Sequence, residues 1–224
     1  MKKGLLIIML LLISGGAYAQ LNKFEIGVEG GPDLSGIADP GQPDQNDNQN
    51  WVLHFSVGMT GQYNFDSILS IKGGISFERK GYSTGTIMLD GSGANPSSDY
   101  FPVAVKLDYL VIPVFIKASL GGKVKFFVNG GPYYAQLIGA FNIMQSNGLS
   151  LPNSYLISTN SYNHIDAGLA GGFGWDIQLN KRLTLDCELR FSFSLLNNGS
   201  PFRTEVTENQ SANLLFGLRY KIKK

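Results

Sequence analysis

The residues best suited to catalysis are two histidines and an acid close to one of them in the chain. His54 falls on the polar face of an expected strand, and His164 precedes Asp166 by two residues. With one of the many serines they could supply the nucleophile, base and orienting acid of an acyl-transfer or protease site. However, residues at i and i+2 share a face of any strand, and no serine can be assigned to them. We expect no enzyme, and a His/Asp/Ser site near the loops remains an alternative.

Patterns that would bind a metal, a cofactor or a nucleic acid are also weak. Asp39, Asp44 and Asp47 lack the order of an EF-hand loop, and their surroundings favour a solvated loop. No expected helix follows Gly171 to Gly174, although a dinucleotide-binding motif requires one. The formal net charge is +1, so there is no basic excess to attract nucleic acid. We therefore expect no cofactor and no metal.

Ionisable residues are instead placed at every second position of short segments. From Arg182 to Leu195, seven apolar residues occupy one face and seven polar residues the other, a period of two that a helix could not keep. Charged residues make up only 16% of the chain, which favours a β-structure that hides part of its surface from water. Eight such segments are found. They span about residues 24–29, 53–63, 69–78, 103–120, 123–134, 164–179, 182–195 and 213–222.

The connections between these segments alternate between short and long. The short turns are Asn64–Ser67, Gly121–Gly122 and Asn180–Lys181, and the long connections are Pro32–Asn50, Gly81–Phe101, Asn142–Ser161 and Asn197–Gln210. This alternation is typical of outer-membrane barrels, whose short turns are periplasmic. The expected fold is all-β, an eight-stranded antiparallel up-and-down transmembrane β-barrel with both termini periplasmic. A soluble lipocalin-like barrel would need the opposite faces, apolar inside and polar outside, and is the less favoured alternative.

The cost of a charge in lipid decides which face points inward. A Lys or Arg on the lipid face near the bilayer midplane costs roughly 2–4 kcal/mol, so the polar faces must line the interior. The expected inward acids are Glu25, Glu29, Glu78, Asp166, Asp176, Asp186 and Glu188, and the expected inward bases are Lys72, Lys80, Lys117, Lys123, Lys125, Arg190, Arg219 and Lys221. Because the two sets are nearly balanced and buried charges persist when paired, we expect salt bridges that plug the lumen. The site residues of this network are Glu25, Glu29, Lys72, Glu78, Asp186, Glu188, Arg190, Arg219 and Lys221.

The first residues have the three regions of a secretory signal peptide. Lys2 and Lys3 form a basic start, Leu5 to Ile13 an apolar core, and Ala17 to Ala19 a small-residue cleavage site. We expect residues 1–19 to be a signal peptide and residues 20–224 the barrel domain. The single cysteine, Cys187, allows no intramolecular disulfide and falls on the apolar face.

Three segments carry a resemblance to a known family. The stretch from Lys106 to Lys117, with Tyr-Leu-Val-Ile-Pro at its centre, resembles the Tyr-Leu-Glu-Ile-Pro segment of the PorT-like outer-membrane β-barrel family of Bacteroidetes. The stretches Val128–Tyr134 and Asp166–Gly174 are similar to two further strands of that family. Val111 stands where the family usually has Glu. The resemblance implies the barrel fold and an outer-membrane location. The namesake's link to protein secretion is not transferred, because fold does not imply function.

The sequence therefore predicts a non-enzymatic barrel in the outer membrane. Its expected role is structural, or an interaction through four long extracellular loops, and it is expected to be a monomer. The expected partners are outer-membrane lipid and an unidentified protein of the cell exterior or envelope. A barrel enzyme and a narrow channel are the alternatives.

Overall fold

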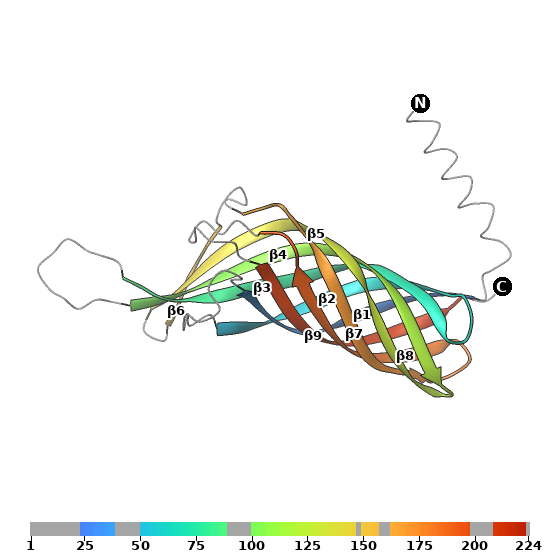
Figure 1. Cartoon of the computed structure of the whole chain (residues 1–224). Coiled ribbons are helices and arrows are strands. Elements are labelled where there is room, and N and C mark those ends of the chain that lie inside the picture. Colours follow the sequence, from blue (N-terminus) through green and yellow to red (C-terminus); the bar gives the residue numbers. More distant parts are fainter. Residues whose placement is uncertain are drawn as a thin grey trace, which may run out of the picture.

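The structure is a computed structural model that describes residues 23–38, 50–88, 100–146, 149–156, 162–197 and 208–222 (Figure 1). Residues 1–22, which include the expected signal peptide, lie outside the described residues. Within the described residues, nine strands form one sheet. They are β1 (Phe24–Ala38), β2 (Asn50–Asn64), β3 (Leu69–Met88), β4 (Tyr100–Gly121), β5 (Val124–Ser146), β6 (Leu149–Leu156), β7 (Ile165–Gln178), β8 (Leu183–Ser194) and β9 (Glu208–Lys221).

Eight of these strands close into a barrel. The sheet order is β4-β3-β2-β1-β9-β8-β7-β5-β6, and an additional pairing of β4 with β5 closes the ring. All pairings are antiparallel, including that of β1 with β9, the first and last strands. The expected eight-stranded antiparallel barrel is thus confirmed. No helix in the described part of the chain is long and apolar enough to cross a membrane.

The strands extend further than the alternation of apolar residues predicts. β1 continues to Ala38, β3 to Met88 and β5 to Ser146, all inside expected long connections. β6 lies inside the expected connection Asn142–Ser161 and pairs with the end of β5, for example Phe141 with Leu156. In Figure 1, β3 to β6 reach beyond the ends of β8 and β9. Outside a membrane one face need not be apolar, so backbone pairing continues where the period-two signal has ended.

The three short turns lie at the opposite end and are confirmed. In the turn between β2 and β3, Asp66 Oδ1 accepts hydrogen bonds from the amides of Ile68 and Leu69 at 2.7 and 2.8 Å. Asn180 Oδ1 has the same role between β7 and β8, where the amides of Arg182 and Leu183 donate at 2.7 and 2.9 Å. The third turn begins at Gly121, whose φ of 135° excludes most side chains.

The outer wall of the barrel is apolar and exposed. Leu53, Met59 and Leu120 have 68, 64 and 63% of their surface exposed, and Val28 and Phe216 are also exposed. In contrast, most of the charged side chains on the same strands are buried. This arrangement is the reverse of a soluble domain, and it suits a wall surrounded by lipid.

Candidate functional site: the charged barrel interior

The middle of the lumen contains a closed ring of two acids and two bases. Lys72 Nζ lies 2.7 Å from Glu29 Oε2 and 2.9 Å from Glu188 Oε2. Arg190 binds the same acids, with Nη1 3.0 Å from Glu29 Oε1 and Nε 2.8 Å from Glu188 Oε1. Lys72 is on β3 and Glu188 on β8, which stand four places apart in the ring of eight strands. The ion pairs of this middle layer therefore cross the lumen from one wall to the other.

A second layer lies nearer the short turns and is centred on Arg219. Its guanidinium lies 2.8 Å from Asp186, 3.0 Å from Glu25 and 2.9 Å from Asp176. Lys117 Nζ lies 2.8 Å from Asp176 Oδ2, so this carboxylate joins the two bases. Five strands (β1, β4, β7, β8 and β9) each supply one of these five residues, and we name the group the turn-side layer.

A third layer lies nearer the long connections, and its ion pairs are longer. Lys80 Nζ is 3.7 Å from Asp166 Oδ2 and 3.9 Å from Glu78 Oε2. The ammonium also lies 5.0 and 5.6 Å from the ring centroids of Tyr133 and Tyr109, within the range of cation–π attraction. We name this group, together with the acid Asp33, the loop-side layer.

Asp33 is the acid that this layer leaves least satisfied. It is fully buried on β1, and neither carboxylate oxygen has a hydrogen-bond partner among the described residues. The sequence places Asp33 in the expected connection Pro32–Asn50, whereas β1 continues to Ala38. The polar composition of that stretch predicts a loop, whereas in the structure Pro32 and Asp33 pair with Phe55 and His54 of β2.

The three layers of the described interior hold more carboxylates than bases, and the other expected inward bases lie at the mouth of the barrel. Eight carboxylates face five bases, a difference of three. The acids are Glu25, Glu29, Asp33, Glu78, Asp166, Asp176, Asp186 and Glu188, and the bases are Lys72, Lys80, Lys117, Arg190 and Arg219.

Three expected inward bases lie at the turn end instead. Lys123 is exposed in the turn between β4 and β5. Lys125 Nζ donates to the carbonyl of Ser67 in a neighbouring turn at 3.0 Å. Lys221 lines the mouth of the barrel and makes no ion pair with a described residue. Of the nine expected site residues, all except Lys221 belong to the three layers.

Neutral side chains that the sequence did not single out complete the layers. Asn129 Nδ2 donates to Glu188 Oε1 at 3.0 Å, and the amide of Asn209 donates to Asp166 Oδ2 at 3.1 Å. Gln62 accepts a hydrogen bond from Arg219. Gln62 and Asn129 fall at inward positions of expected strands, whereas Asn209 falls in an expected loop. The period-two alternation alone could have identified Gln62 and Asn129 as inward residues.

The inward glycines have two different roles. A Cβ on Gly217 would lie 3.2 Å from both Asp186 Oδ2 and the carbonyl oxygen of Val28, which fits the expectation that glycine makes room for the charged side chains. At Gly168 and Gly174 a Cβ would lie 2.0 Å from a backbone carbonyl oxygen of the adjacent strand. These two glycines permit close approach of strands, a role that the alternation pattern does not reveal.

One ion pair lies outside the lumen. Arg79 on β3 and Asp108 on β4 are register partners, with Nε to Oδ1 2.6 Å and Nη2 to Oδ2 2.8 Å. The guanidinium carbon also lies 5.7 and 5.9 Å from the rings of Phe55 and Phe77. Bidentate pairing and aromatic cover explain how a charge is accommodated on the outer wall.

The residues of the alternative catalytic site do not form a relay. Ser194 Oγ donates directly to Asp166 Oδ1 at 2.6 Å, without a histidine between them. His164 is exposed, and only its backbone carbonyl bonds within the described part, for instance to the amide of Leu137 at 2.8 Å. His54 is on β2, and no described residue forms a hydrogen bond with its Nε2. Among the described residues no group of three His, Cys, Asp or Glu could hold a metal ion.

A closed antiparallel barrel with an apolar wall and ion-paired interior defines an integral protein of the outer-membrane β-barrel class. The sequence matches the family described as outer membrane protein beta-barrel domain over residues 18–199, and the chain belongs to this family. The protein is accordingly located in the outer membrane.

Several solved outer-membrane barrels are similar in structure. Neisserial surface protein A is 12% identical, with a TM-score of 0.48 over 89% of this chain and 97% of that one. OprG from Pseudomonas aeruginosa is 13% identical, with a TM-score of 0.44 and coverage of 90% and 97%. Ail, the attachment invasion locus protein of Yersinia pestis, is 15% identical, with a TM-score of 0.40 and coverage of 88% and 98%. No curated protein matches the sequence.

Proposed function

We propose that this protein is a closed, non-enzymatic barrel that presents its long connections to a partner outside the cell or in the envelope. The observation that carries the proposal is the middle layer, in which Lys72 and Arg190 bridge Glu29 and Glu188 across the lumen. An eight-stranded barrel is only wide enough for its own side chains, so these pairs and the layers on either side leave little room for solutes.

A conductance measurement tests whether the lumen is closed. The folded protein, inserted into a planar bilayer, is expected to give no stable unitary conductance above that of lipid alone. Removal of the middle layer by Glu29→Ala, Lys72→Ala, Glu188→Ala and Arg190→Ala together should add at most brief openings, because the turn-side layer remains. A stable conductance of the unmodified barrel would contradict the proposal and favour a narrow channel.

The proposed orientation places the short turns and both termini in the periplasm, after removal of residues 1–19. It is supported by the signal-peptide pattern and by the pairing of β1 with β9, which brings the two chain ends to the turn end. Thiol labelling of intact cells is the test. In a Cys187→Ala background, a cysteine at Gly122 should be protected from an impermeant reagent and a cysteine at residue 94 should react.

The proposed interaction role is supported by the strand extension of β3 to β6, which continues the backbone ladder beyond the ends of β8 and β9. Crosslinking in intact outer membrane, followed by capture of the folded barrel, tests it. Replacement of residues 89–99 by a Gly/Ser segment should remove a specific crosslinked product, whereas the same treatment of turn residues 122–123 should leave it. A product that survives both replacements, or none in the unmodified protein, argues for a purely structural barrel.

The finer family assignment is also a proposal. The Tyr-Leu-Val-Ile-Pro stretch within β4 supports membership of the PorT-like barrels of Bacteroidetes. This membership would add no role in secretion, because fold does not imply function; Val111, which is buried, also provides no inward carboxylate where the family usually has Glu.

A further inference from the structure

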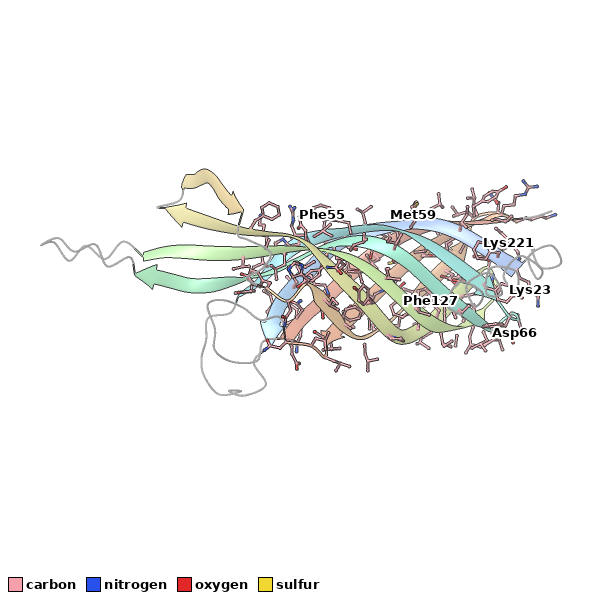
Figure 2. All side chains as sticks on the ribbon, turned by 90° about the horizontal axis from the view of Figure 1, so that it is seen from above. Lys23, Phe55, Met59, Asp66, Phe127 and Lys221 are labelled. Atoms are coloured by element: carbon pink, nitrogen blue, oxygen red, sulfur yellow. The ribbon has the colours of Figure 1, made fainter. Side chains whose placement is uncertain are left out.

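The turn end of the barrel contains a vestibule, a cavity of about 300 Å³ that opens away from the turn-side layer. Its floor includes Arg219 and Asp176, and its walls come from all three short turns and the end of β9. Figure 2 shows Lys221 and Asp66 at this end of the molecule. A cavity of this volume has room for a small solute.

The vestibule is lined by more cations than anions. Six bases and three acids line it. The bases are Lys123, Lys125, Lys181, Arg182, Arg219 and Lys221, and the acids are Glu25, Asp66 and Asp176.

The three acids are already engaged. Asp176 binds Lys117 and Arg219, and Glu25 binds Arg219. Asp66 accepts from two backbone amides of its own turn. Lys123, Lys125, Lys181, Arg182 and Lys221 consequently have no carboxylate within ion-pair distance among the described residues. Five positive charges around one cavity repel one another unless an anion lies between them.

The acidic lumen prevents such an anion from going deeper. Apart from the residues that line the vestibule, the described layers above it hold six carboxylates and four bases, and Arg219 and its partners close the floor. An anion is therefore attracted to the mouth and repelled by the interior, which makes the vestibule a binding site and not an entrance.

We propose that the vestibule binds a compact multivalent oxyanion of the phosphate class. This goes beyond the proposed interaction role, which concerns the opposite end of the barrel. Lysine ammonium groups are mobile point charges, so the site selects for charge density more than for shape. Two sources share this chemistry: a free polyphosphate, and the phosphate of an anionic lipid headgroup at the same level.

Calorimetry with inorganic tripolyphosphate on the folded, full-length mature protein in neutral detergent tests the proposal. We expect saturable one-to-one binding at low ionic strength, weakened as salt shortens the screening length. Lys125→Gln and Lys221→Gln should each weaken binding about threefold to tenfold, because each removes one nearby charge. Lys106→Gln is the matched control, since it removes the same charge from β4 near the loop-side end.

The Lys106→Gln control distinguishes binding in the vestibule from a general attraction of tripolyphosphate to positive charge on the protein. If Lys106→Gln weakens binding as much as Lys221→Gln, or if the unmodified protein binds no tripolyphosphate, the proposal is wrong. Heat-modifiable migration on a detergent gel confirms that each variant is folded.

Lipid nanodiscs distinguish the two sources. If headgroups occupy the vestibule, phosphatidylglycerol should weaken tripolyphosphate binding relative to phosphatidylcholine, and Lys221→Gln should reduce that difference. If a free anion is the ligand, both lipids should give the same affinity. Either result supports the site, whereas a lipid effect that Lys221→Gln leaves unchanged overturns the headgroup source.

Discussion

At the scale of single residues, the interior is governed by the cost of leaving a buried charge alone. Each glutamate of the middle layer binds both Lys72 and Arg190, so removal of one base leaves both acids short of a partner. Removal of one member of a buried ion pair typically costs about 3–5 kcal/mol, whereas an exposed pair contributes about 0–1 kcal/mol. The same substitution should therefore have different effects in the lumen and at the mouth.

Lys72→Met tests this difference. We expect it to lower the free energy of unfolding by about 3 kcal/mol, because Glu29 and Glu188 would share Arg190 alone. Lys125→Met, which removes a base without a carboxylate partner, should cost less than about 1 kcal/mol. Urea unfolding in lipid vesicles, followed by fluorescence of Trp51 and Trp175, measures both. Equal losses would mean that the middle layer is solvated.

Gly217 provides a test of close packing against the acids. A Cβ there would lie 3.2 Å from Asp186 Oδ2 and 3.4 Å from Glu29 Cβ, so it would crowd two layers at once. Gly217→Ala should cost about 1–3 kcal/mol, the usual range for overpacking. Gly122→Ala is the control, because no atom lies within 4 Å of its added Cβ. An unfolding midpoint for Gly217→Ala that equals the control would contradict the packing described here.

At the scale of elements, two of the three short turns are stabilised by the same pattern of hydrogen bonds. A carboxylate accepts them in one turn and a side-chain amide oxygen in the other. Asp66 and Asn180 each place one side-chain oxygen on the amides two and three residues ahead. Only the carboxylate can be titrated. The backbone hydrogen bonds from Leu69 and Ile68 lower the pKa of the exposed Asp66 carboxyl. The β2–β3 turn should thus depend on pH, and the β7–β8 turn should not.

The sign of this dependence follows from the lowered pKa. The contribution of Asp66 is present above its unfolded pKa of about 3.9 and is lost as pH falls through the lower folded value. The amide proton of Leu69 should therefore shift in NMR spectra only below about pH 4, whereas that of Leu183 should stay constant. Asp66→Asn should abolish the shift and keep the turn. A titration of Leu69 centred above the ordinary aspartate value would disprove the assignment.

The elements also explain which parts of the fold could be predicted. Alternation identified the eight barrel strands and their inward faces because lipid requires an apolar wall along the spanning part of each strand. It missed β6 and the ends of β1, β3 and β5, where water accepts either kind of side chain. It also assigned Lys125 and Lys221 to the lumen, since the period of two gives the face of a residue but not its height along the barrel. Near the mouth, an inward side chain reaches water.

At the scale of the whole molecule, the outer wall forms an apolar band, and the free-energy cost of placing a charge on it depends on depth in the bilayer. Figure 2 shows Met59 between Phe55 and the turn-end residues Lys23 and Lys221. Leu120, the penultimate residue of β4, is equally exposed, at 63% against 64% for Met59, but lies beside a turn. The two positions differ in depth while their exposure is the same.

Arginine substitutions at Met59 and Leu120 measure how the cost of a charge on the outer wall changes with depth. Met59→Arg should cost roughly 2–4 kcal/mol in lipid vesicles, and Leu120→Arg roughly 0–1 kcal/mol, because the penalty falls toward the interface. Reversible unfolding by urea from the same vesicles gives both values. Similar costs at the two sites would show that the wall does not meet hydrocarbon at Met59.

The pairing of β1 with β9 closes the barrel and brings the two ends of the barrel strands side by side. The amide of Ile222, just after β9, donates to the carbonyl of Phe24 at 3.0 Å, so the two ends of the folded sequence meet. Once this seam is joined, none of the eight barrel strands has a free edge, whereas before closure β1 and β9 would each have one. A linker that joins the two ends across the seam would allow the chain to begin at a different turn without changing the order of the strands in the barrel. A circularly permuted chain opened at residues 122–123 should accordingly fold to the same barrel, with the seam reduced to one more short turn.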